Sequence, residues 1–253
     1  MSFIRTAAFL TVSLAAATAA QAQATVKNDG QFRAALGLGA SLASGNTKAT
    51  NLSLTGDAVR ATDQNKLSLY GNMQYARSNG QTTADQLRLG TRYDQNLNAS
   101  LFAFGGLDLD RNKFANLNLR AQLSGGLGWH VVKTPNTSFD LFGGLALVND
   151  KYKTAMFIDG ATRDSYSYTA LLLGEESTHK LSDTTSFKQR MTVVPNLKNS
   201  GEFLANWDAG LAVAMTKALN LNVGFSFAHN SDPGPGRKST DTLLTTGISV
   251  KFD

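Results

Sequence analysis

The pair His229 and Ser231 is where residue types and spacing in this sequence come closest to a catalytic site. A serine hydroxyl becomes a nucleophile when a base lies within hydrogen-bond reach and a third group orients that base. No Asn or Asp stands out as the orienting group, and Ser231 lies where an alternating segment gives way to a loop rich in Pro and Gly. A histidine beside a turn serine is the simpler interpretation, so we assign no catalytic residue.

Metal and cofactor chemistry has equally little support. The chain has no Cys, and its three histidines, His130, His179 and His229, lie far apart in sequence. Asp232 and Asp241 with loop carbonyls could hold Ca²⁺, but that ion takes six to eight oxygen ligands and only two carboxylates are present. We therefore expect no bound metal and no cofactor.

The composition is that of a folded protein without disulfides. Of 253 residues, 42% are hydrophobic and 17% charged, which excludes a disordered tail, and the lack of Cys excludes a disulfide-stapled miniprotein. The net charge of +5 comes from 24 basic and 19 acidic residues. No block of basic residues is present, so we expect no nucleic-acid partner. These observations favour a structural, binding or transport protein over an enzyme.

The N-terminus has the pattern of a secretory signal peptide. Arg5 precedes an apolar run over 7–20, and small residues at 20, 22 and 24 have the A-x-A spacing of a cleavage site. We expect residues 1–24 to be removed, after Ala22 or Ala24, and residues 25–253 to form a single domain.

The rest of the chain alternates between apolar and polar residues. Leu219, Leu221, Val223, Phe225 and Phe227, for example, alternate with Asn, Gly and Ser. Successive strand side chains point to opposite faces, so each such segment has one apolar and one polar face. The pattern predicts about twelve strands, at roughly 31–43, 49–60, 66–77, 82–94, 98–111, 116–131, 137–149, 164–176, 184–195, 201–215, 218–230 and 239–252.

The strand lengths favour an up-and-down antiparallel transmembrane β-barrel over a soluble sandwich. Sandwich strands are usually about five or six residues long, whereas a tilted strand that crosses a bilayer needs about 9–11. Outer-membrane barrels also alternate short periplasmic turns with longer outer loops, and the connections at 150–163 and 230–238 are the longest expected here. The first connection, 44–48, is an exception, because it reads as a tight Gly-Asn hairpin.

The up-and-down order of the strands predicts which face of the barrel wall each charged or aromatic residue occupies, and near which end of the barrel it lies. We expect five acidic and five basic side chains to face the barrel interior: Asp57, Arg88, Arg92, Asp108, Asp110, Arg120, Asp140, Lys188, Arg190 and Asp208. We expect two lipid-facing aromatic girdles. The periplasmic girdle contains Phe32, Tyr93, Trp129, Phe139, Phe187 and Phe252, and the outer girdle contains Tyr75, Tyr166, Tyr168, Phe203 and Phe227.

Two segments break the alternation. In 98–111, Phe102 and Phe104 lie at the same alternate positions as the aspartates, so apolar and charged residues would share one face of the strand. In 164–176, leucines occupy alternate positions that are otherwise polar. A bulge in either strand would restore the pattern.

The strand order also predicts charge pairs. Simple hairpin registers place Arg120 opposite Asp108 and Arg190 opposite Asp208. Opposite charges across a ladder stabilise each other, and balanced ladders favour a lumen closed by its own side chains.

Two motifs carry a resemblance to a known family. The segment 37–48, GLGASLASGNTK, and the segment 230–241, NSDPGPGRKSTD, followed by a last strand ending at Phe252, resemble the salt-induced outer-membrane proteins, a domain of unknown function (family 481). The resemblance implies a Gram-negative outer-membrane barrel, exported through the periplasm. Such barrels commonly end on an aromatic residue read by the assembly machinery, and here Asp253 follows Phe252. Outer-membrane lipids and this machinery are the implied partners.

The sequence thus predicts an outer-membrane barrel with a structural or envelope role under salt stress, narrow solute passage at most, and no catalysis. Two alternatives remain open at this point. One is an outer-membrane lipid hydrolase using Ser231 and His229, and the other is a soluble secreted β-sandwich that binds a ligand.

Overall fold

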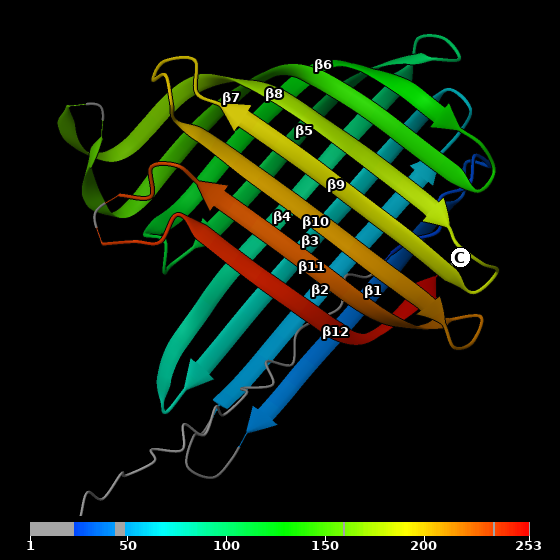
Figure 1. The fold of residues 1–253 in the computed structure, drawn as a ribbon, viewed down its shortest axis with the longest axis horizontal. Coiled ribbons are helices and arrows are strands. Elements are labelled where there is room, and N and C mark those ends of the chain that lie inside the picture. Colours follow the sequence, from blue (N-terminus) through cyan, green and yellow to red (C-terminus); the bar gives the residue numbers. More distant parts are fainter. Residues whose placement is uncertain (1–22, 44–48, 159, 235, 253) are drawn as a thin grey trace, which may run out of the picture.

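The chain folds into one closed β-barrel of twelve antiparallel strands (Figure 1). The structure, a computed structural model, describes residues 23–43, 49–158, 160–234 and 236–252. The strands are β1 (Phe32–Ala43), β2 (Ala49–Ala61), β3 (Asn65–Ser78), β4 (Gln81–Asn96), β5 (Leu101–Asn112), β6 (Leu117–Lys133), β7 (Thr137–Ile158), β8 (Ala161–Lys180), β9 (Thr185–Pro195), β10 (Phe203–Ala214), β11 (Leu219–Asn230) and β12 (Thr240–Phe252). The predicted fold class is confirmed, and a two-sheet sandwich is excluded.

Pairing between the first and last strands closes the barrel. β1 pairs with β12 from Ala34 opposite Phe252 to Leu38 opposite Ile248, and every other pair joins strands that are consecutive in sequence. β1 begins and β12 ends at the same end of the barrel, which we call the terminal end. The opposite end, where the β7–β8 and β11–β12 connections lie, is the loop end (Figure 1).

Three predictions fall wholly or largely outside the described residues. These are the signal peptide, of which residues 1–22 are not described, the Gly-Asn hairpin at 44–48, and Asp253. Within the described ranges, no helix is long and apolar enough to cross a membrane.

The β7–β8 connection differs from the prediction. The sequence predicts a long loop at 150–163, but β7 continues to Ile158 and β8 begins at Ala161, with a register shift between Lys151 and Met156. Met156, Ile158 and Tyr166 pack together and are 7%, 6% and 4% exposed. Burial of these side chains gives the extension a small apolar core, which a loop would lack.

Large apolar side chains cover much of the outer surface of the barrel. Leu123, Leu127 and Leu145 expose 58%, 60% and 54% of their surface, although they lie in the middle of long strands. Their sequence neighbours of the other parity point to the interior, as strand geometry requires. The result is an apolar belt around the barrel.

The interior holds an apolar cluster that explains the first break in the alternation. Phe102 and Phe104 of β5 point inward, where they pack with seven more residues of β7 to β10: Phe142, Ala146, Val148, Ala170, Leu172, Val194 and Leu204. β5 pairs with β4 without a register shift, and its shift against β6 comes only after Asp110, so no bulge separates the phenylalanines from the aspartates, although the sequence predicts one. The two phenylalanines share the parity of the aspartates because all of them face the interior.

The second break has a similar cause and corrects two girdle assignments. In β8, Leu171 and Leu173 are 40% and 53% exposed and point outward, while Leu172 between them is buried inside. Tyr166 and Tyr168 have the inward parity, and their rings lie 5.2 Å apart. The lipid-facing position predicted for these tyrosines is therefore wrong, because strand β8 has the opposite facing from the one expected.

β6 and β7 approach so closely that one pair of glycines cannot carry side chains. Gly126 lies opposite Gly144, and a Cβ on Gly126 would come within 2.1 Å of the Gly143 carbonyl oxygen. We expect Gly126→Ala to destabilise the barrel by about 1–3 kcal/mol, because the added methyl meets backbone that cannot move aside. Gly105→Ala is the control, since a Cβ there meets nothing within 4 Å. Urea unfolding of the refolded proteins measures the difference, and equal stability would contradict the close approach.

Candidate functional site in the barrel interior

Charged side chains occupy the interior of the barrel and form its candidate functional site. All ten charged residues predicted to face the interior have the inward parity of their strands, and they lie at successive heights from the terminal end to the loop end. Their partners come partly from neighbouring strands and partly from strands across the lumen.

Arg88 of β4 spans the lumen at mid-height. Its Nη2 donates a hydrogen bond to Asn206 Oδ1 on β10 (2.8 Å), and its Nη1 lies 3.5 Å from Asp208 Oδ2 on the same strand. β4 and β10 are diametrically opposite in the barrel, with five strands between them on either side. Asp110 on the neighbouring β5 accepts a hydrogen bond from Arg88 Nε (2.7 Å) and fixes the guanidinium in this position. One arginine therefore bridges the full width of the lumen.

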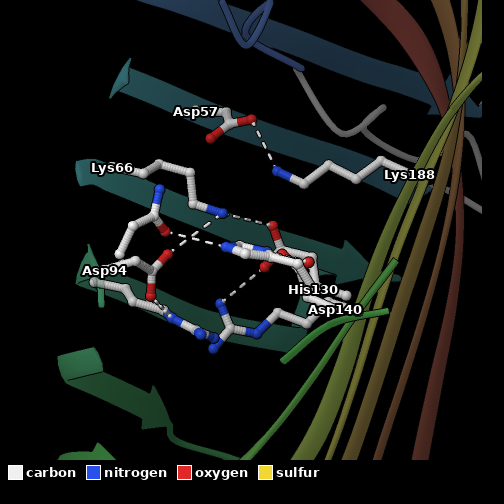
Figure 2. Close-up of polar contacts among 10 residues, drawn as sticks. Asp57, Lys66, Asp94, His130, Asp140 and Lys188 are labelled. Carbon is white, nitrogen blue, oxygen red and sulfur yellow. Dashed lines mark hydrogen bonds and ion pairs between the residues drawn. The ribbon is translucent and has the colours of Figure 1, made fainter. Parts of the chain in front are cut away.

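A second group of ion pairs crosses the lumen nearer the terminal end (Figure 2). Lys66 Nζ on β3 lies 3.4 Å from Glu176 Oε1 on β8 and 3.4 Å from Asp94 Oδ2 on β4. Asp57 on β2 and Lys188 on β9, which face each other in Figure 2, form another pair across the lumen at 3.4 Å. None of these strand pairs except β3–β4 is adjacent, so the contacts close the interior rather than support its wall.

The same end carries a histidine held from both sides. His130 Nδ1 is 2.7 Å from Asp140 Oδ1, and His130 Nε2 is 3.0 Å from Asn96 Oδ1. At the same end, Arg33 of β1 is only 6% exposed and donates hydrogen bonds of 2.8 and 2.6 Å to the carboxylate of Asp29, which holds the pKa of Asp29 below its usual range. Polar side chains thus occupy the terminal end on several strands.

Arg92 joins the charged network to the apolar cluster. Its Nε donates to Asp94 Oδ1 (2.6 Å), while its guanidinium carbon lies 4.5 Å and 4.2 Å from the ring centroids of Phe104 and Phe142. Only 5% of Arg92 is exposed. A cation over aromatic faces is stabilised by the ring quadrupole, and more strongly where water is excluded. Arg92 therefore connects the ion pairs of the lumen to its apolar cluster.

The two larger cavities among the described residues lie in the interior, one toward each end. The loop-end cavity measures 360 Å³ and the terminal-end cavity 130 Å³. Both are lined by Asn72, Arg88 and Asp208. Gln23, near the start of the described chain, also lines the terminal-end cavity and donates a hydrogen bond from Nε2 to the Gly210 carbonyl (3.0 Å). The cavities therefore meet at the Arg88 bridge.

Of the two predicted charge pairings, one register is correct. Arg190 lies opposite Asp208 in the β9–β10 ladder, as predicted, although the ion pair of Arg190 is with Glu176 at 3.7 Å. Arg120 lies opposite Asp110 and not Asp108, and its ion pair is with Asp150 on β7. The second prediction is wrong because a register shift after Asp110 displaces the β5–β6 hairpin.

Sequence reasoning missed several inward charges. Asp94 and Lys66 have the inward parity of their strands, so this signal could have identified them. Glu176 lies in β8, whose inward and outward faces are the reverse of those predicted. Asp150 lies in the segment where the sequence predicts a loop. His130 also has the inward parity of β6.

The remaining aromatic residues predicted for the girdles have the outward parity. At the terminal end, Phe32, Tyr93, Trp129 and Phe252 are 45–55% exposed, and Phe139 and Phe187 are partly exposed. At the loop end, Phe203 is 37% exposed, and Tyr75 and Phe227 are partly exposed.

His229 and Ser231 do not form a nucleophile and base. Ser231 Oγ accepts a hydrogen bond from the Phe203 amide (2.8 Å) and donates to the Gly201 carbonyl (3.3 Å). His229 Nδ1 is 2.8 Å from Thr240 Oγ1, and its ring stacks on Phe203. The hydroxyl and the imidazole each bond to other groups, in the arrangement of a rim histidine beside a turn serine. No cluster of three or more metal-binding side chains occurs in the described ranges.

The geometry defines a closed twelve-stranded β-barrel with an apolar outer belt and a polar interior crossed by ion pairs. The chain belongs to the family described as "Protein of unknown function, DUF481", whose model matches residues 36–252. It is 25% identical over 224 residues to the uncharacterized protein YdiY of Escherichia coli (strain K12), a match that covers 87% of this chain and 83% of that protein.

Solved structures with a similar fold are outer-membrane barrels. The COG4313 outer membrane channel from Pseudomonas putida F1 has a TM-score of 0.50 and 13% identity, over 90% of this chain and 97% of that chain. The NanC porin has a TM-score of 0.45 and 10% identity, over 87% of this chain and 98% of that chain. At these identities the likeness concerns the fold alone.

Proposed function

We propose that the protein is an outer-membrane barrel whose lumen is closed at rest by its own side chains, so that it passes small polar solutes slowly or not at all. The bridge from Arg88 to Asn206 and Asp208 across the full lumen is the observation that carries this proposal. It acts as a constriction between the two cavities. We propose no catalytic role.

The apolar belt supports a membrane location. A strand that crosses a bilayer presents apolar side chains to lipid on alternate positions, and these strands do so at lengths of 11 to 22 residues. With both termini on the periplasmic side, the loop end faces outward. Outer-membrane lipids and the assembly machinery are then the partners, and export through the periplasm follows from the predicted signal peptide.

The character of the lumen separates this protein from a general porin. A barrel of about 8 strands is filled by side chains, whereas 16 to 18 strands leave an aqueous channel. Here an apolar cluster and ion pairs that cross the lumen both occupy the interior. Because charges of both signs line the interior and pair with one another, the lumen offers no continuous path that favours one sign of ion.

Removing the bridge is expected to open the lumen. Arg88→Ala deletes both contacts to β10, so planar-bilayer recordings of the refolded variant should show stable conductance steps that the unaltered protein lacks. Arg111→Ala is the control, because it also removes an arginine near the loop end, but one whose ion pair, with Asp85 at 3.9 Å, is to the neighbouring strand β4 and not across the lumen. Porin-like conductance of the unaltered protein would refute a closed lumen, and an unchanged Arg88→Ala record would refute the bridge as the constriction.

We also propose an envelope role under raised salt, which rests on the family resemblance. A deletion strain should grow more slowly than its parent at high NaCl, and a plasmid copy of the gene should restore growth. Equal growth across NaCl concentrations would remove this part of the proposal and leave the closed barrel unaffected.

A further inference from the structure

Four carboxamide side chains line the loop-end cavity without a hydrogen bond to the protein. Asn72 and Gln74 come from β3, Gln86 from β4 and Gln122 from β6. In the described part of the chain none of the four has a hydrogen-bond partner, although many other Asn and Gln side chains do. Gln74 lies opposite Gln86 in the β3–β4 ladder, so two carboxamides meet the cavity side by side.

Two arginines that line the same cavity between the strands, Arg88 and Arg120, are in contrast already paired, whereas Asp232, Arg237, Lys238 and Asp241 near the loop end contribute two charges of each sign. Arg88 bonds to Asp110 and Asn206, and Arg120 makes two hydrogen bonds of 2.6 Å to Asp150. A charged ligand would have to break one of these pairs, and breaking a paired charge in a confined site is costly. Between the strands, the groups left to bind a ligand include neutral carboxamides, and the four charges near the loop end sum to zero.

The unpaired groups match hydroxyls. A carboxamide offers two donors and an oxygen that accepts twice, and a hydroxyl both donates and accepts, so the two can pair in either direction. Tyr152 and Met156 also line the cavity and provide apolar surface for the C–H faces of a sugar ring. The volume of 360 Å³ lies within the range of small-molecule sites, about 300–1,000 Å³.

We propose that the loop-end cavity binds a neutral, polyhydroxylated solute of monosaccharide or disaccharide size through Asn72, Gln74, Gln86 and Gln122. The proposal rests on the proposed function in one respect, because the outward orientation of the loop end sets the side from which the solute enters. It adds the chemical class of the solute that reaches the constriction at Arg88. Binding itself needs no passage through the lumen.

Ligand-observed saturation-transfer NMR tests the proposal on the full mature chain, refolded in a detergent without a sugar headgroup. Glucose and maltose are the neutral probes, glucuronate the anionic and glucosamine the cationic probe. We expect saturation transfer to glucose or maltose, and weaker transfer to both charged sugars. No transfer to the neutral sugars, or stronger transfer to either charged sugar, would overturn the proposal.

A double variant and a matched control locate the binding. Gln74→Leu with Gln86→Leu should weaken the apparent affinity about tenfold or more, because two hydrogen bonds to the solute are lost. Gln95→Leu makes the same change on β4 at the terminal end and should bind as the unaltered protein does. Equal affinity of all three proteins would place any binding outside the cavity and refute the proposal, provided heat-modifiable migration shows that each is folded.

The NMR result and the bilayer recordings fail independently. A protein that conducts like a porin but binds neutral sugars refutes the closed lumen and keeps the binding site. A protein that shows no conductance and binds no neutral sugar keeps the closed lumen and refutes the binding site.

Discussion

Leu123→Arg is expected to prevent efficient folding into lipid bilayers. Leu123 lies in the middle of the apolar belt, with 58% of its surface exposed, and faces Leu107 and Leu147 on the neighbouring strands. An arginine on the lipid face near the bilayer midplane costs about 2–4 kcal/mol. A loss of that size is a large fraction of the stability of a domain.

The adjacent residue provides the control for this prediction. Gln122→Arg places the same side chain on the inward face, where it borders the loop-end cavity and can be solvated. Heat-modifiable migration after refolding into vesicles measures the folded fraction of each variant. If both variants fold with the same yield, the outward face of β6 does not meet lipid and the membrane location is wrong.

The strand pattern was predictable because it depends on a local rule. Side chains alternate between two faces, and a lipid-facing parity must stay apolar over the whole strand, so the boundaries of most strands agree within three residues. The exceptions are β7 and β8, whose hairpin extends beyond the belt. There the stabilising contact is between Met156 and Tyr166, which no alternation rule brings together.

The composition of the lumen could not be predicted from parity alone. Parity says which side chains share a face, but it does not say whether that face meets water or other side chains. Phe102 and Phe104 point inward because Phe142 and Leu172, from strands about forty and seventy residues away, complete a dry cluster with them. Tyr166 likewise faces the interior and not lipid, and it packs there with Met156 and Ile158.

Cross-strand partners were predictable only where the hairpin keeps a simple register. The β9–β10 ladder runs without a shift, and Arg190 faces Asp208 as the sequence predicts. The β5–β6 ladder shifts after Asp110, and β6–β7 shifts between Leu117 and Leu119. Such irregularities depend on the fit of neighbouring strands, so the true partner of Arg120 needed the structure.

Asp150→Ala is expected to be among the most destabilising single changes in the barrel. Asp150 is 2% exposed, and both its carboxylate oxygens accept hydrogen bonds of 2.6 Å from Arg120. Tyr152 donates a further hydrogen bond of 3.2 Å to it. Removing one partner of a buried pair leaves the other charge uncompensated, which costs about 3–5 kcal/mol.

Two further variants make this result specific to the pair. Asp108→Ala, at the partner that simple register assigns to Arg120, removes an acceptor of the Tyr70 hydroxyl and should cost less, about 1–3 kcal/mol. Arg120→Met combined with Asp150→Leu should recover most of the lost stability, because replacing both members of a buried pair by apolar residues is often neutral. Urea unfolding in vesicles ranks the four proteins. A greater loss for Asp108→Ala than for Asp150→Ala would mean that Arg120 depends on Asp108, and a double variant as unstable as Asp150→Ala would mean that the loss comes from packing rather than from the unpaired arginine.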